Sequence, residues 1–119
     1  MKATLGQVII YVEDMKAQAA FYRDTLGLKV TWPENEANYE NWVTFDTGAC
    51  TLALHSGGKR RIGEDAAKFV FFVDDINAAR AELMERGVEM GEVFVPIPGV
   101  QVANAHDPEG NEFSIESHG

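Results

Sequence analysis

The sequence predicts an α+β fold made of two tandem copies of a strand–helix–three-strand (βαβββ) unit. Residues 7–27 and 68–87 each contain a short apolar strand, an aspartate, an amphipathic helix and a glycine, and the two aspartates are 61 positions apart. The turn sequences that begin at Asp46 and Asp107 keep the same offset. A duplicated unit with one apolar sheet face predicts two curved mixed β-sheets around a cavity, with the helices on the outside.

Local signals place both helices. Asp14 and Asp75 stand where an N-cap residue accepts hydrogen bonds from the first turn, and Gly27 and Gly87 stand where a helix ends. The apolar residues repeat at helical spacing, which predicts one α-helix in each unit. The stripes are Met15, Ala19, Tyr22 and Leu26 in the first helix and Ile76, Ala79 and Leu83 in the second.

Three strands are expected after each helix. In sequence order they are residues 28–32, 41–46 and 50–55, then 88–95, 99–106 and 112–116. The chain is therefore expected to be one domain, 1–119, with repeats at about 5–56 and 67–118. Residues 57–66 form the linker, and its run Lys59-Arg60-Arg61 is interpreted as solvated, with an anion site as the alternative.

Composition excludes several classes of function. Lys and Arg number 10 against 19 Asp and Glu, a net charge of −9, which disfavours nucleic acid and anionic membranes as partners. No apolar run approaches the length of a membrane span or a signal peptide, so we expect a cytoplasmic protein. The single cysteine, Cys50, is expected to be a small buried strand residue.

Strand side chains alternate between two faces, and this alternation separates apolar faces from mixed ones. The apolar faces are expected under the helices, and the mixed faces are expected to line a small-molecule cavity. The predicted lining consists of Gln7, Ile9, Tyr11, Thr51, Ala53, His55, Lys68, Val70, Phe72, Glu112, Ser114 and Glu116.

The chain resembles the vicinal oxygen chelate superfamily, which includes glyoxalase I, extradiol dioxygenases, fosfomycin resistance enzymes and bleomycin-binding proteins. The segments that carry the resemblance are VIIYVEDMKAQAAFYRDTLGLKV, FVFFVDDINAARAELMERGVEM and HDPEGNEFSIE. The resemblance implies a homodimer. It also implies that enzymes of this kind hold a divalent metal through one residue on the first and last strand of each half.

Matched residue by residue, these four metal positions fall on Gln7, Ala53, Lys68 and Ser114. Only the glutamine resembles a family ligand, because alanine has no donor atom, a protonated lysine has no lone pair, and serine is a weak neutral ligand. We therefore predict no metal and no other cofactor. The alternative is Zn²⁺, Ni²⁺ or Fe²⁺ at a shifted site, made by His55 and Glu116 with Gln7 or Tyr11.

Lys68 has two interpretations. It forms a structural ion pair with Glu112 or Glu116, or it presents a cation to an anionic ligand or a developing oxyanion. The ion pair is favoured, because a lysine among carboxylates stays charged and needs a partner.

The remaining aromatic and histidine residues give weaker signals. Three aromatic side chains either pack the sheet rim or stack on a flat ligand, namely Trp32, Tyr39 and Trp42. His106 and His118 are expected to be solvated, the second of them in a frayed C-terminal tail.

Three functions follow from these residues. The leading hypothesis is metal-free binding of a small hydrophobic or aromatic molecule, including cationic antibiotics, by the predicted lining and Trp42. The second is a metal-dependent glyoxalase-like lyase, isomerase or dioxygenase with the shifted site. The third is a metal-free enzyme that uses Tyr11, His55 or Glu116 as acid or base on a small carbonyl compound.

Overall fold

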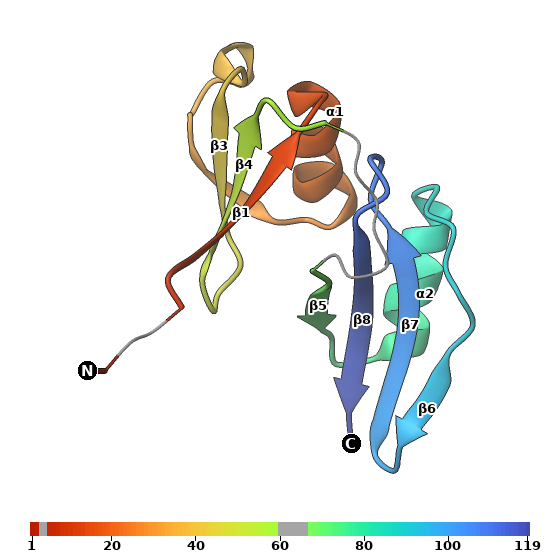
Figure 1. The fold of residues 1–119 in the computed structure, drawn as a ribbon. Helices are drawn as coiled ribbons and strands as arrows, with labels where there is room; N and C mark the ends of the chain where they lie inside the picture. The colour runs from red at the N-terminus through yellow and green to blue at the C-terminus, as the bar shows by residue number, and fades with distance from the viewer. Residues whose placement is uncertain (3–4, 60–66) are drawn as a thin grey trace. The chain divides into compact units, whose positions relative to one another are not determined.

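The computed structural model describes residues 1–2, 5–59 and 67–119, and it divides into two compact units, Met1–Arg61 and Ile62–Gly119 (Figure 1). Each unit contains a four-stranded mixed sheet and one α-helix. The predicted α+β class and the repeated strand–helix–three-strand order are confirmed. The unit boundary falls in the predicted linker 57–66, but Arg60 and Arg61 lie outside the described residues.

The first unit has strand order β1-β4-β3-β2, with β1 parallel to β4 and the other neighbours antiparallel. Parallel pairing of β1 with β4 requires a crossover, and α1 with the segments after it supplies that connection. The elements are β1 (Gln7–Val12), α1 (Met15–Ala20), β2 (Lys29–Trp32), β3 (Trp42–Asp46) and β4 (Thr51–Ser56).

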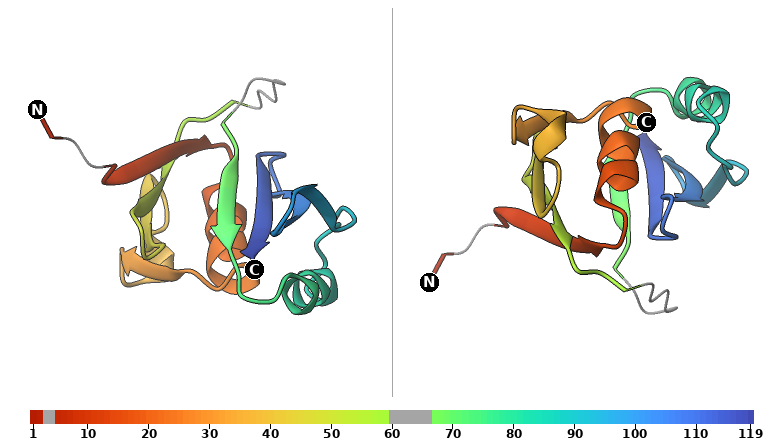
Figure 2. Two further views of the ribbon diagram at one scale, coloured as in Figure 1. Left: turned by 90° about the horizontal axis from the view of Figure 1, so that it is seen from below. Right: turned by 90° about the horizontal axis from the view of Figure 1, so that it is seen from above.

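The second unit repeats this topology, with strand order β5-β8-β7-β6 and β5 parallel to β8. Figure 2 shows α2 along one side of this sheet. The elements are β5 (Phe69–Phe72), α2 (Ile76–Glu85), β6 (Phe94–Ile97), β7 (Val100–His106) and β8 (Glu112–His118).

The predicted apolar stripes face the cores of their own units. Met15, Ala19 and Tyr22 are buried in the first unit, and Ile76 and Leu83 are buried in the second. Both aspartates cap as predicted, because their Oδ1 atoms accept from backbone N–H groups of the first turn. The sheet residues beneath the helices are also buried, namely Val12, Leu52, Leu54, Phe113 and Ile115.

The end of the first helical segment differs from the prediction. After α1, residues Phe21–Thr25 wind as a π-helix, and the Leu26 amide donates to the Phe21 carbonyl at 3.0 Å. Tyr22 is fully buried in this wider turn, with its ring centroid 6.1 Å from that of Phe45. Expecting one uninterrupted α-helix was wrong, because the tertiary position of Tyr22 is not visible in the local pattern.

The strand expected at 88–95 is also placed differently, since β6 begins only at Phe94. The Gly91 amide donates to the Asn104 carbonyl at 2.8 Å, and the Gly91 carbonyl accepts from Arg80 Nε at 2.8 Å. These two hydrogen bonds hold the segment before β6, which does not form the regular hydrogen-bond ladder of a strand. Pro96 lies within the edge strand, where a missing N–H is tolerated.

Cys50 was expected in a strand and buried, and both expectations were wrong. It lies in the turn before β4, where its amide donates to Thr47 Oγ1 at 3.3 Å, and it is half-buried. The helices of the described residues are all too short or too polar to cross a bilayer.

Candidate functional site

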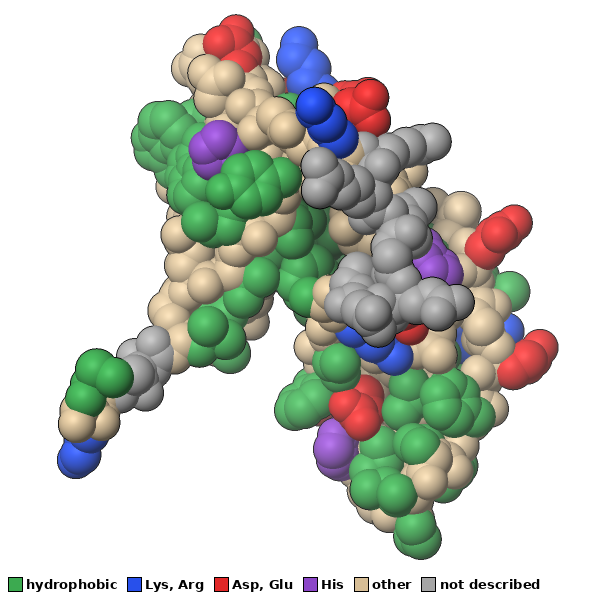
Figure 3. All heavy atoms as spheres, viewed as in Figure 1, with side chains coloured by type: hydrophobic (Ala, Val, Ile, Leu, Met, Phe, Trp, Pro, Cys, Tyr) green, Lys and Arg blue, Asp and Glu red, His purple; other side chains and the backbone are tan. Residues whose placement is uncertain are grey.

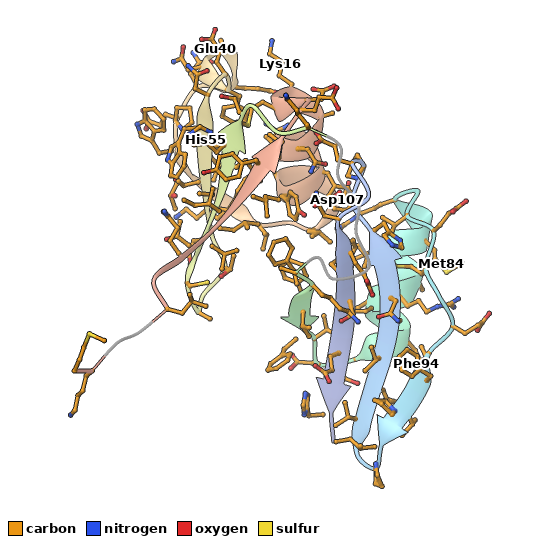
Figure 4. The ribbon with its side chains drawn as sticks, viewed as in Figure 1. Lys16, Glu40, His55, Met84, Phe94 and Asp107 are labelled. Carbon is orange, nitrogen blue, oxygen red and sulfur yellow. The ribbon has the colours of Figure 1, made fainter. Side chains whose placement is uncertain are left out.

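An aromatic cluster lies on the mixed face of the first sheet. Tyr11 and Trp42 are the register neighbours of His55 on either side, one from parallel β1 and one from antiparallel β3. The ring centroids are 4.9 Å apart for Tyr11 and His55 and 5.6 Å apart for Trp42 and His55, the second pair edge to face. We call these three residues the His55 cluster. Figure 4 shows His55 extending from this sheet.

The backbone fixes one nitrogen of the His55 ring. Nδ1 lies 2.6 Å from the Ser56 carbonyl oxygen, which only accepts hydrogen bonds, so Nδ1 carries the proton. In the neutral imidazole, Nε2 then holds the lone pair. His55 can thus accept a hydrogen bond or a proton through Nε2, between two aromatic rings.

The residues of the His55 cluster differ in how far they are exposed to solvent. Tyr11 is 62% exposed, while Trp42 and His55 are half-buried. Ile9 is the next residue on the same face of β1 and is also exposed. A flat apolar ligand would therefore find accessible ring surface on a backing of regular strands.

Ala53 lies in the middle of this face and is completely buried. Its register neighbours are Ile9 on β1 and Thr44 on β3, and both carry larger side chains than alanine. Gln7 lies at the start of β1 and is exposed. Ala53 is therefore inaccessible to a ligand, and the functional groups of this face lie on either side of it.

In the second unit, Lys68 lies just before β5 and is held by two oxygens. Nζ donates to Asn104 Oδ1 at 2.8 Å and lies 3.5 Å from Glu112 Oε1. This is the ion pair that the sequence favoured, with Glu112 as the partner. The structure adds Asn104 on β7, which the sequence analysis did not single out.

Ser114 takes the place in the second unit that Ala53 takes in the first. It is 1% exposed, between Val70 on β5 and Asn104 on β7. The central residue of each mixed face is thus small and buried. The alternation of faces along the sequence could not show this burial.

Glu116 and Phe72 are register neighbours on β8 and β5. The Glu116 side chain is 20% exposed, and its carboxylate lies 3.7 Å from Nε2 of His118. The His118 ring centroid is 5.0 Å from that of Phe72. His118 is solvated as predicted, since its side chain is 54% exposed. The prediction of a frayed tail was wrong, because β8 extends to His118 and sets it beside both neighbours.

Some of the predicted site residues thus come together within each unit. Tyr11, Trp42 and His55 come together in the first, and Phe72 and Glu116 come together in the second. Tyr39 belongs to neither group, because it is buried and receives the Arg23 guanidinium over its ring at 5.9 Å. Trp32 ends β2 with an exposed side chain.

The residues at the family's metal positions do not fit a divalent metal. Ala53 is buried and has no donor atom, and the Lys68 ammonium is already paired with Glu112. In the described part of the chain, no three His, Cys, Asp or Glu side chains gather closely enough to hold a metal ion. Gln7 and Ser114 alone supply only neutral oxygens, which bind Zn²⁺, Ni²⁺ or Fe²⁺ poorly.

Comparison with known proteins identifies relatives over nearly the whole chain. Residues 4–115 match the model of the Glyoxalase/Bleomycin resistance protein/Dioxygenase superfamily. An uncharacterised Bacillus subtilis protein, YraH, is 34% identical over 93% of this chain and 95% of its own length. An ethylmalonyl-CoA/methylmalonyl-CoA epimerase of Cereibacter sphaeroides is 32% identical over 98% of this chain and 97% of its own.

Solved structures share the fold. TnmS3, an antibiotic binding protein from Streptomyces, aligns with a TM-score of 0.80 at 20% identity, covering 99% of this chain and 98% of that one. The fosfomycin resistance protein FosX from Listeria monocytogenes aligns with a TM-score of 0.81 at 13% identity, covering 100% and 96%. The family model, the two relatives and these structures lead to one conclusion: this chain belongs to the Glyoxalase/Bleomycin resistance protein/Dioxygenase superfamily.

Proposed function

We propose that this protein binds a small hydrophobic or aromatic molecule without using a metal. The observation that carries the proposal is the His55 cluster, in which exposed aromatic surface surrounds a histidine with a defined proton acceptor. The neighbouring metal position, Ala53, is a buried methyl group. Binding of such a molecule requires no metal ligand, so the residues present are sufficient for it.

The cluster suits a planar ligand with a polar atom. Tyr11 and Trp42 offer ring faces and edges for stacking, and Nε2 of His55 accepts one hydrogen bond between them. Figure 3 shows a histidine enclosed by hydrophobic side chains in this region of the first unit. The net charge of −9 favours neutral or cationic ligands over anions. Among the structural neighbours, TnmS3 is described as an antibiotic binding protein.

The test is calorimetric titration with proflavine, a planar aromatic cation, and 2-naphthol, a planar neutral compound. We expect saturable binding that Tyr11→Ala and Trp42→Leu each weaken by about five- to thirtyfold, because one stacked ring contributes about 1–2 kcal/mol. Met84→Ala is the control, because it removes an exposed apolar side chain from α2.

Two results would refute this proposal. One is the absence of saturable binding of either compound to the wild-type protein. The other is an equal loss in Met84→Ala and the two cluster variants, which would indicate non-specific adsorption to apolar surface.

A second candidate function is proton transfer at carbon next to a thioester carbonyl. Two observations favour it: Nε2 of His55 is a proton acceptor, and the 32% identical relative is an ethylmalonyl-CoA/methylmalonyl-CoA epimerase. Coenzyme A is strongly anionic, and the acidic chain repels it at long range. This candidate therefore stands second.

Deuterium uptake from D₂O into methylmalonyl-CoA, followed by NMR, separates the two functions. An enzyme would catalyse exchange at C2, and His55→Gln would lower its rate by about 10²-fold or more, since the ring would no longer accept the proton. Binding of proflavine without any such exchange would leave only the binding function.

We also propose that the protein is a cytoplasmic homodimer, as the family resemblance implies. Exposed apolar side chains on edge strand β6, including Phe94 and Ile97, support association. Sedimentation equilibrium gives the mass directly, and cell fractionation gives the location. A 13.1 kDa species at all concentrations would contradict the dimer.

A further inference from the structure

The internal repeat places an aromatic residue beside a titratable residue at equivalent positions of the two units. Tyr11 and His55 are register neighbours in the first unit, and Phe72 and Glu116, each 61 positions later, are register neighbours in the second. An aromatic ring and a titratable side chain therefore lie side by side in each case. The difference is chemical, because the second pair carries a carboxylate in place of an imidazole.

We propose that Phe72 and Glu116 form a binding position for an organic ammonium group. The position lies within the second unit and rests on its own residues. It is therefore independent of the binding function proposed for the His55 cluster.

The first argument comes from the partners of the carboxylates on β8. Glu112 has a lysine 3.5 Å away, a permanent cation at neutral pH. Among the described residues, the ion-pair partner of Glu116 is His118 at 3.7 Å, which is charged only when protonated. Among the described residues, no lysine or arginine is therefore paired with the half-buried Glu116 carboxylate, and such a carboxylate favours a cationic partner.

The second argument comes from the apolar surroundings. Phe72 is 74% exposed and adjoins Glu116 on one side, while Val102 adjoins it on the other. A cation over the face of a phenyl ring is attracted by its quadrupole within about 6 Å. Figure 3 shows acidic and histidine side chains among hydrophobic ones on this part of the second unit.

These features select among cations. A bare metal ion needs several oxygen ligands, and Glu116 is one carboxylate beside hydrocarbon. An ammonium that carries apolar substituents matches both neighbours, because its charge faces Glu116 and its carbon atoms contact Phe72. Anions are disfavoured by the carboxylate itself and by the net charge of −9.

The test is an NMR titration of ¹⁵N-labelled protein with benzyltrimethylammonium chloride at constant ionic strength. We expect saturable shifts at the amides of Phe72, Glu116 and His118. Glu116→Gln and Phe72→Leu should each weaken binding by about three- to tenfold, the size of one ion-pair or cation–π contact. Amide dispersion in the same spectra verifies that each variant is folded.

Glu112→Gln is the matched control, because it neutralises a carboxylate on the same strand and face that already has a lysine partner. It should leave the affinity within about twofold of wild type, since its charge is already compensated. Benzyl alcohol, the neutral probe, should bind at least about threefold more weakly, because it lacks the charge.

The proposal is overturned by equal weakening in Glu112→Gln and Glu116→Gln, by equal binding of benzyl alcohol, or by shifts that never saturate. Shifts confined to Trp42 and His55 would also overturn it while supporting the binding function of the first unit. The two proposals can therefore fail separately.

Discussion

At Gly58 there is no room for a side chain. An added Cβ would lie 2.5 Å from the Tyr11 carbonyl carbon and 2.6 Å from the Val12 nitrogen, where the chain leaving β4 passes over the end of β1. The Gly58 amide donates to the Val12 carbonyl at 3.0 Å, which fixes this approach. Because the contacting atoms belong to the backbone, the crowding can be relieved only by moving a strand.

We therefore expect Gly58→Ala to lower the free energy of unfolding by about 1–3 kcal/mol, the usual cost of overpacking. Gly6→Ala is the control, because nothing lies within 4 Å of a Cβ at Gly6. It should change stability by less than about 0.5 kcal/mol. Urea denaturation of both variants measures the difference, and equal stabilities would contradict the close approach of Gly58 to the end of β1.

Arg23 and Asp24 form a bidentate pair on the surface of the first unit. Arg23 Nε donates to Asp24 Oδ1 at 2.6 Å, and Arg23 Nη2 donates to Asp24 Oδ2 at 2.7 Å. Glu36 Oε2 lies 3.5 Å from Nη1 of the same guanidinium. The hydrogen bonds from Arg23 lower the pKa of Asp24 below its usual range. They also raise the pKa of Arg23.

This pair predicts a small dependence of stability on pH. A carboxyl with a lowered folded pKa stabilises the protein above its unfolded value of about 3.9, and that stabilisation is lost as the pH falls through the folded pKa. Because Asp24 is mostly exposed, the contribution is only a few tenths of a kcal/mol.

The measurement is urea denaturation of wild type and Asp24→Asn at pH 6 and pH 2.5. The wild type should be the more stable at pH 6, and the gap should narrow at pH 2.5, where protonation removes the charge of Asp24. A gap that stays constant or widens on acidification would contradict the assigned pairing.

At the scale of the elements, α2 depends on its N-cap. Asp75 Oδ1 accepts from the Ala78 amide at 3.1 Å and so satisfies one of the first-turn N–H groups that have no partner within the helix. Asp74 precedes it with an exposed side chain outside the helix. The two neighbouring aspartates thus differ in role although they share a charge.

Asp75→Ala should destabilise the protein by about 1 kcal/mol, whereas Asp75→Asn should retain most of the stability, because an amide oxygen also caps. Asp74→Ala is the control for the lost charge and should cost less than about 0.5 kcal/mol. Thermal unfolding followed by circular dichroism compares the three. A larger loss in Asp74→Ala than in Asp75→Ala would refute the cap.

At the scale of the whole molecule, the two units share one topology but not one chemistry. The first offers an imidazole between aromatic rings, and the second offers a carboxylate beside a phenyl ring and a lysine bound to Asn104. Neither central position, Ala53 or Ser114, supplies a charged ligand. A duplicated fold has thus kept its topology while its functional side chains differ.

The metal-free proposal applies to the whole chain and can be tested on it. Purified protein should contain no stoichiometric metal, and Ni²⁺, Zn²⁺ or Fe²⁺ should not raise the melting temperature. A site occupied at a hundred times its Kd would stabilise the fold by about 2.7 kcal/mol, an easily measured shift. Such a shift, abolished by His55→Ala or Glu116→Ala, would refute the proposal and support the shifted metal site.

Local patterns in the sequence were sufficient to predict the repeat, the two capped helices and the division of each sheet into an apolar and a mixed face. Caps such as Asp75 act within a few residues, and the faces follow from a period of two, so neither depends on distant contacts. The candidate residues Tyr11, His55, Phe72 and Glu116 were found in this way.

Tertiary structure alone decided the rest. It placed Phe21–Thr25 in a π-helix, started β6 at Phe94, and brought His118 to Glu116. It also buried Ala53 completely while leaving Tyr11 exposed. Each of these outcomes depends on which strand lies beside another and in which register, and residues far apart in the chain determine that together.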